Sequence, residues 1–178
     1  MILGGTGMLA GCTATLVAEG WHVVVPSRRY SPIRADRPGG SGAQALWVET
    51  DWSDPRLLAQ RAGRALGGPA DLLVAWVHEQ YRPAVLTAVA PLLRAGAPVV
   101  EVLGSGAADP VSGCPEPELA DHPAQQVVLG LIRQGEATRW LNDEEVRDGV
   151  LAAVRRALAG RPPSVFQVGD APPLAFQW

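Results

Sequence analysis

The glycine-rich segment near the start of the chain has the residue types and spacing that bind a phosphate group. Residues 4–11 read GGTGMLAG, and within them Gly5 to Ala10 match the pattern Gly-x-Gly-x-x-Gly/Ala. Glycine lets a backbone turn tightly and approach an anion, while the N-terminus of a following helix offers N–H groups and the positive end of its dipole. The pattern therefore predicts a loop that binds the pyrophosphate of a dinucleotide, with an ordinary glycine-rich turn as the alternative.

A second set of residues lies where a dinucleotide-binding protein contacts the 2′ position of the ribose, which distinguishes NAD from NADP. The predicted strand over residues 21–26 is followed by Ser27, Arg28 and Arg29, with no carboxylate. An NAD site usually has an acidic residue at this place, whereas arginine suits the 2′-phosphate of NADP. We therefore predict that Ser27 donates a hydrogen bond and that the two guanidinium groups bind phosphate. The alternative is that both arginines are solvated surface charges.

A third polar segment follows the predicted strand over residues 45–50. Asp51 is predicted to accept a hydrogen bond from the adenine amino group, with the main chain of Trp52 alongside. Asp54 is better explained as the cap of a helix that begins with Pro55. The complete set of predicted cofactor contacts in these three segments is Gly4, Gly5, Thr6, Gly7, Met8, Leu9, Ser27, Arg28, Arg29, Asp51 and Trp52.

Strands and helices that alternate along the chain are needed to position these residues. Apolar runs predict strands at residues 2–3, 21–26, 45–50, 71–77, 98–103, 126–132 and 164–168. Helical patterns cover residues 8–19, 54–66, 83–95 and 142–158. This alternation predicts a single α/β domain over residues 1–178, a Rossmann-type doubly wound fold with a mostly parallel sheet of six or seven strands. The proline- and glycine-rich segment 104–123 predicts a loop where a crossover helix is expected.

The composition and charge of the chain argue against several classes of function. With 47% hydrophobic and 19% charged residues in 178, the chain is typical of a compact globule. A net charge of −3 gives no basic footprint for nucleic acid or an anionic membrane surface. No apolar run is long enough to span a bilayer, and nothing resembles a signal peptide, so we expect a cytoplasmic protein. The two cysteines have no metal-ligand spacing, and no metal is expected.

These stretches together resemble the short-chain dehydrogenase/reductase superfamily, in particular its short, truncated members. The matching segments are GGTGMLAG, VVVPSRR, the Asp51 region, LLVAWVH, VVEVLGS and RWLNDEEV. The resemblance implies a Rossmann fold with NADP(H) bound across the carboxyl ends of the strands. It also implies that Ala75, Trp76 and Val77 lie beside the nicotinamide ribose.

The sequence departs from this family in its acid–base residues. The family uses a Tyr-x-x-x-Lys pair on the helix after the fifth strand, helped by a serine at the end of that strand. Ser105 occupies the position of the serine, but no tyrosine follows Tyr81 and all 15 basic residues are arginine. Any mechanism that needs a lysine amino group is therefore excluded.

The remaining candidates for catalysis are His78 and Ser105. His78 follows the strand over residues 71–77 and can exchange protons near neutral pH, the alternative being a histidine hydrogen-bonded to backbone at a strand end. Ser105 can orient a carbonyl or imine, the alternative being a Gly-Ser-Gly turn. His122 and Tyr81 are further candidates. Arg139 could hold an anion beside Trp140, or Trp140 could be a hydrophobic staple at the cap formed by Asn142.

Three functions fit these residues. The first is an NADP(H)-dependent oxidoreductase acting on a small molecule; an imine or iminium is favoured because it accepts hydride without a protein acid. The second is a non-catalytic NADP(H)-binding sensor or partner subunit. The third is a lyase or isomerase that uses the nucleotide as a scaffold. A homodimer or higher homo-oligomer is expected in each case.

Overall fold

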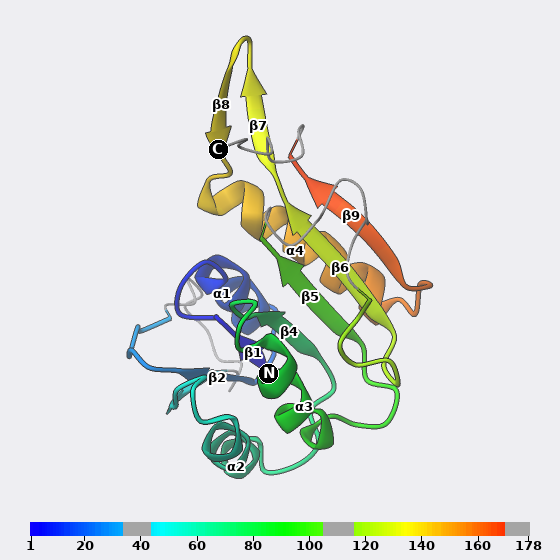
Figure 1. The fold of residues 1–178 in the computed structure, drawn as a ribbon. Coiled ribbons are helices and arrows are strands. Elements are labelled where there is room, and N and C mark those ends of the chain that lie inside the picture. Colours follow the sequence, from blue (N-terminus) through cyan, green and yellow to red (C-terminus); the bar gives the residue numbers. More distant parts are fainter. Residues whose placement is uncertain (34–43, 105–115, 170–178) are drawn as a thin grey trace.

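The computed structural model describes residues 1–33, 44–104 and 116–169, and its central sheet is parallel throughout (Figure 1). The five strands run in the order β1-β4-β5-β6-β9. They are β1 (Ile2–Leu3), β4 (Leu73–Trp76), β5 (Val99–Leu103), β6 (Ala124–Leu129) and β9 (Ser164–Val168). Two further strands, β2 (Val23–Ser27) and β3 (Ala45–Glu49), form a separate parallel pair. The predicted α/β fold is confirmed.

The central sheet has fewer strands than the predicted six or seven. Strand β1 has only two residues, Ile2 and Leu3, and its ladder runs along β4. Strand β2 instead packs against β1 through side chains: Val25 lies in one hydrophobic cluster with Ile2, and Val24 lies in the other with Leu3. The short first strand therefore separates the β2–β3 pair from the ladder of the central sheet.

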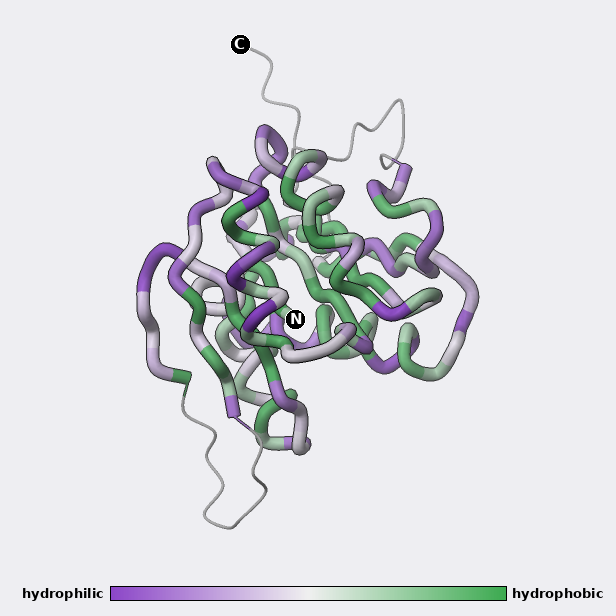
Figure 2. The backbone as a smooth tube through the Cα atoms, turned by 90° about the horizontal axis from the view of Figure 1, so that it is seen from below, coloured by the Kyte–Doolittle hydropathy of each residue, from purple (hydrophilic) through white to green (hydrophobic). Residues whose placement is uncertain are grey.

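Helices lie on both faces of the sheet. Helices α1 (Ala10–Ala18) and α4 (Asp143–Leu158) pack on one face. Helices α2 (Pro55–Leu66) and α3 (Arg82–Val89) pack on the other face. A short turn of 3-10 helix, η1 (Ala90–Leu92), follows α3. In Figure 2 the hydrophobic stretches gather in the middle of the molecule and the hydrophilic stretches lie along its outside. No helix in the described ranges is long and apolar enough to cross a membrane.

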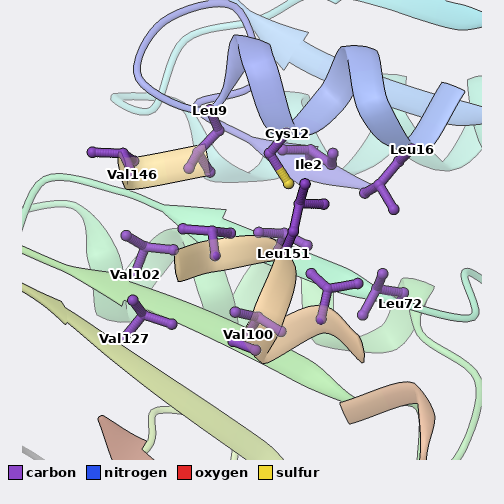
Figure 3. Close-up of a cluster of buried hydrophobic side chains, with 14 of the residues drawn as sticks. Ile2, Leu9, Cys12, Leu16, Leu72, Val100, Val102, Val127, Val146 and Leu151 are labelled. Carbon is purple, nitrogen blue, oxygen red and sulfur yellow. The ribbon is translucent and has the colours of Figure 1, made fainter. Parts of the chain in front are cut away.

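The larger hydrophobic cluster joins α1 and α4 to the strands. Figure 3 shows Leu9, Cys12 and Leu16 pointing toward the strands. Val100 on β5 and Val127 on β6 form the strand side of the same cluster. Successive strand residues alternate between faces, since Val99 belongs to the cluster under α2 and α3 whereas Val100 belongs to this one. Both faces of the sheet are therefore buried, as expected for a parallel sheet.

Capping residues begin two of the helices as predicted. Asp54 accepts a hydrogen bond from the Leu57 N–H at 3.0 Å, with Pro55 at the first helical position. Asn142 and Glu145 form a complete capping box at α4.

The predicted staple at the cap of α4 is wrong. Trp140 is 70% exposed, and the residue directly before Asn142 is Leu141, which packs on the cluster containing Val146. The guanidinium of Arg139, for which binding of an anion was one prediction, makes two 2.8 Å hydrogen bonds to the Glu145 carboxylate. The segment before α4 is thus fixed by an ion pair and by Leu141.

A hairpin follows β6 where the sequence predicted one continuous strand over residues 126–132. The strand ends at Leu129, and β7 (Leu131–Gln134) pairs antiparallel with β8 (Ala137–Trp140). Gly135, with φ of +64°, opens the tight turn between them. Figure 1 shows this hairpin projecting beyond the sheet.

The part of segment 104–123 that the structure describes contains no helix, in agreement with the predicted loop. Residues 105–115 lie outside the described ranges, and residues 116–123 are irregular, with a turn at residues 120–121. Leu119 packs into the cluster under α2 and α3, and the Glu118 N–H donates to the Glu101 carboxylate at 3.0 Å. Glu101, a buried carboxyl on β5, therefore helps to hold this loop on the sheet.

Burial of Glu101 predicts a pH dependence of stability. Desolvation raises the pKa of Glu101 above its ordinary value of 4.5, although the Glu118 N–H, Arg82 and Gln126 lower it. The Glu101 carboxyl thus binds its proton more tightly in the folded state than in the unfolded state. The stability that this tighter proton binding contributes is lost as pH rises from 4.5 through the pKa of folded Glu101. We expect Glu101→Gln to flatten the fall in the free energy of unfolding over this range.

Urea unfolding at a series of pH values measures this effect. The exposed Glu116→Gln is the matched control and should keep the slope of the wild-type protein. A Glu101→Gln slope equal to that of the wild type would contradict the assignment.

Candidate functional site

A cleft of about 290 Å³ lies where the carboxyl ends of β2, β3 and β4 meet the glycine loop after β1. Its lining residues are Gly4, Thr6, Gly7, Met8, Pro26, Ser27, Arg28, Arg29, Thr50, Trp52, Trp76 and His78. The sequence prediction had named most of them as cofactor contacts, and His78 as a catalytic candidate. The structure thus brings together segments that are far apart in the chain.

Five of the predicted cofactor contacts do not line this cleft. Leu9, Ala75 and Val77 are buried in the hydrophobic clusters, and Gly5 is buried within the glycine loop. Asp51 does not line the cleft but lies beside Arg28, which does. The side chains of Leu9, Ala75 and Val77 therefore support the loop and strands from inside.

The conformation of the glycine loop is fixed by close packing at Gly4. Gly4 has φ of +81°, and a Cβ there would lie 2.8 Å from the Trp76 carbonyl oxygen. A side chain at Gly5 would meet Thr13 Oγ1 at 2.8 Å and Val25 at 2.9 Å. These two glycines let the loop lie directly against β4, α1 and β2.

Gly7 differs from these two, because packing does not require a glycine there. A Cβ at Gly7 would come no closer than 3.8 Å to the protein, at the Gly4 carbonyl oxygen. The missing side chain instead leaves room inside the cleft, as close approach of a ligand to the backbone requires.

Helix α1 begins immediately after this loop. Leu9 at its N-cap gives no side-chain hydrogen bond, and the first turn has no acidic residue. Thr13 joins helix and loop, because its hydroxyl lies 2.9 Å from the Leu9 carbonyl and 3.2 Å from that of Gly5. The positive end of the helix dipole is thereby held beside the cleft.

The end of β2 places two guanidinium groups on the cleft. Arg28 is largely exposed, with Nε 3.8 Å from Asp51 Oδ2. The Ser27 hydroxyl, predicted to donate to the ligand, donates in this structure to the Arg29 carbonyl at 2.8 Å. Ser27 therefore shapes the turn that carries the arginines.

Asp51 has partners of its own. Its Oδ1 accepts a hydrogen bond from the Ser53 N–H at 2.8 Å. Hydrogen bonds from the backbone and side chain of Ser53, and to a smaller degree the charge of Arg28, lower the pKa of Asp51. The carboxylate stays ionised beside Arg28, and its contact with adenine remains a prediction.

Aromatic rings from three segments gather beside the cleft. The ring of His78 lies 4.7 Å from that of Trp76 and 5.4 Å from that of Trp52, edge to face in both cases. The rings of Trp76 and Tyr81 lie 6.1 and 6.3 Å from that of Trp52. Flat apolar walls of this kind suit a planar heteroaromatic base.

The catalytic candidates are not brought together in the described residues. His78 lies with Trp52, on the β3 and β4 side of the cleft, while Ser105 lies outside the described ranges. His122 is at the opposite end of the sheet, because its Nδ1 is 2.8 Å from the carbonyl of Ala97, which precedes β5. Within the described part of the chain, no group of three or more His, Cys, Asp or Glu residues could hold a metal ion.

Thr50 is a site residue that the sequence analysis missed. It follows β3 and lines the cleft, is 5% exposed, and its hydroxyl has no hydrogen-bond partner in the described structure. A buried hydroxyl without a partner costs on the order of 1–3 kcal/mol, so a polar ligand that bonds to it recovers this energy. The only sequence signal was a polar residue directly before Asp51.

Thr50→Val is expected to affect folding and binding in opposite directions. It removes an unpaired hydroxyl at nearly constant volume, so the free energy of unfolding of the ligand-free protein should rise. Nucleotide affinity should fall about fivefold, the equivalent of one ordinary hydrogen bond of about 1 kcal/mol. Urea unfolding and calorimetric titration with NADPH measure the two effects.

Thr50→Ser keeps the hydroxyl and is the matched control for affinity. Loss of stability in ligand-free Thr50→Val with unchanged affinity would mean that the hydroxyl serves folding alone.

Comparison with known proteins identifies the fold. No protein-family model matches the chain, and no curated protein sequence matches it either. A carbonyl reductase from Pseudomonas aeruginosa PAO1, solved alone and in complex with NADP, is 17% identical, with 96% of each chain covered and TM-scores of 0.64 and 0.63. A short-chain dehydrogenase/reductase from Serratia marcescens BCRC 10948 is 13% identical, with 94% of this chain and 95% of that one covered and a TM-score of 0.63. The chain has the fold of the short-chain dehydrogenase/reductases.

Proposed function

We propose that the protein is an NADP(H)-dependent oxidoreductase acting on a small molecule. The observation that carries the proposal is the cleft, where the glycine loop, two arginines and aromatic walls converge at the carboxyl ends of the strands. Ligands of open α/β sheets bind at this edge. A similar fold binds NADP in the carbonyl reductase from Pseudomonas aeruginosa PAO1.

The residues at the end of β2 support NADP(H) over NAD(H). Arg28 and Arg29 line the cleft, and the Arg28 side chain is 73% exposed and able to turn toward a ligand. A guanidinium group suits a phosphate because it donates two parallel hydrogen bonds. The carboxylate that would bind a free 2′-hydroxyl is absent from this turn.

Two further features of the cleft fit a nucleotide. Gly7 leaves space beside the uncapped N-terminus of α1, as a pyrophosphate requires. Thr50 lines the cleft, and its buried hydroxyl has no hydrogen-bond partner in the described structure, so a ligand that reaches it gains a hydrogen bond. The described lining comes from the ends of β1 to β4. We assign the side of this volume formed by the glycine loop, β2 and β3 to the phosphorylated adenosine end of the cofactor, and the β4 side, with Trp76 and His78, to its nicotinamide ribose.

Bound NADPH would supply a hydride to the substrate. For proton transfer the chain has neither lysine nor a tyrosine after Tyr81, and we propose Ser105 for orienting the substrate and His78 for proton exchange. The ring of His78 packs against that of Trp76 at the cleft wall, and the residue is exposed to solvent. An iminium carbon accepts hydride to give an amine with no proton from the protein, so imines are the favoured substrate class.

The absence of the Tyr-x-x-x-Lys pair also favours a second candidate, an NADP(H)-binding protein without turnover. The two candidates differ in one observable. A reductase oxidises NADPH in the presence of cyclic imines, whereas a sensor or partner subunit binds it without consuming it. Reduction of ketones with no reduction of imines would contradict the proposed substrate class.

Cofactor binding is tested by titrating the purified protein with NADPH and NADH. We expect NADPH to bind more tightly, and Arg28→Ala or Arg29→Ala to weaken NADPH binding about tenfold while leaving NADH unchanged. Each charge-assisted hydrogen bond contributes about 1.5–3 kcal/mol, and 1.4 kcal/mol corresponds to a factor of ten. Isothermal titration calorimetry measures the four dissociation constants.

Arg133→Ala, an exposed arginine on the β7–β8 hairpin, is the matched control and should bind NADPH as the wild type does. Absence of binding by either nucleotide would overturn the proposed function.

A further inference from the structure

The turn that carries the two arginines is held by a tryptophan from the neighbouring strand. Trp47 on β3 donates from its indole N–H to Ser27 Oγ at 3.0 Å. Ser27 in turn donates from its hydroxyl to the Arg29 carbonyl at 2.8 Å. A continuous hydrogen-bonded path therefore runs from β3 to the backbone of the turn.

The direction of this path is fixed by the chemistry of its members. An indole N–H can only donate, and a carbonyl can only accept. The Ser27 hydroxyl has a single hydrogen, so accepting from Trp47 leaves that hydrogen for the Arg29 carbonyl. Its donor is consequently committed to the turn.

A second contact joins Trp47 to the same turn. The ring of Tyr30 lies 5.4 Å from that of Trp47 at an interplanar angle of 73°. This edge-to-face geometry is the favourable arrangement for aromatic pairs. Trp47 thereby restrains Arg29 through Ser27, and it restrains Tyr30 through the ring contact. The Tyr30 side chain is otherwise largely exposed.

We infer that Trp47 is a positioning residue that sets the selectivity for a 2′-phosphorylated nucleotide. This inference rests on the proposed function. Trp47 is not among the residues that line the cleft, so it acts through the turn and not by touching the ligand. Holding the backbone from Ser27 to Tyr30 presents Arg28 and Arg29 to the phosphate without the entropy cost of ordering the turn on binding.

The selectivity follows from what the turn contacts. NADPH has the 2′-phosphate that the arginines would bind, whereas NADH has none. Loosening the turn therefore weakens NADPH binding and leaves NADH binding unchanged. A role of Trp47 in general stability would weaken both alike.

The test uses Trp47→Phe, which keeps an aromatic ring beside Tyr30 and removes the N–H donor. Calorimetry with NADPH and NADH should show NADPH binding weakened about fivefold, as expected for one lost hydrogen bond, with the NADH constant within about twofold. Ser27→Ala breaks the same path at a smaller residue and should give the same pattern. The double variant should add little to either single one.

Trp140→Phe is the matched control, because Trp140 is 70% exposed on the β7–β8 hairpin, and it should leave both constants unchanged. NADPH binding that depends on Arg28 but not on Trp47 or Ser27 would overturn this inference alone. Equal weakening of NADPH and NADH would also overturn it. Absence of NADPH binding in the wild type would overturn the proposed function, and the inference with it.

Discussion

The contact between Gly4 and Trp76 is the constraint on which the rest of the site depends. The backbone of Gly4 passes so close to the end of β4 that a Cβ would lie 2.8 Å from the Trp76 carbonyl oxygen. This approach brings the glycine loop over the strand and starts α1 beside the arginines of the β2 turn. Thr13 ties helix and loop together, so the loop, the aromatic wall and the arginine turn are positioned by one packing arrangement.

The other half of the sheet is built differently. After β5 the described residues 116–123 contain no helix, and the buried carboxyl of Glu101 accepts a hydrogen bond from the Glu118 N–H. After β6 the chain turns into the β7–β8 hairpin before α4 begins. The cleft thus belongs to the half of the fold that β1 to β4 build, and the described residues after β6 add a hairpin before α4 begins.

Most of the fold could be predicted from the sequence because its signals are local. Apolar periodicity located the central strands, and Asp54 and Asn142 marked the starts of α2 and α4. The hairpin was missed because its strands are short and largely exposed, leaving little hydrophobic alternation to detect. The roles of Thr50 and Trp47 depend on contacts between segments distant in sequence, which no local pattern reveals.

The most direct measurement is a calorimetric comparison of adenosine 2′,5′-bisphosphate with adenosine 5′-monophosphate. Both ligands contain the adenosine 5′-phosphate part of the cofactor, and they differ only in the 2′-phosphate that Arg28 and Arg29, which line the cleft, would bind. We expect the bisphosphate to bind at least about tenfold more tightly, since charge-assisted hydrogen bonds contribute about 1.5–3 kcal/mol each. Equal affinity for the two, or no binding of either, would contradict it.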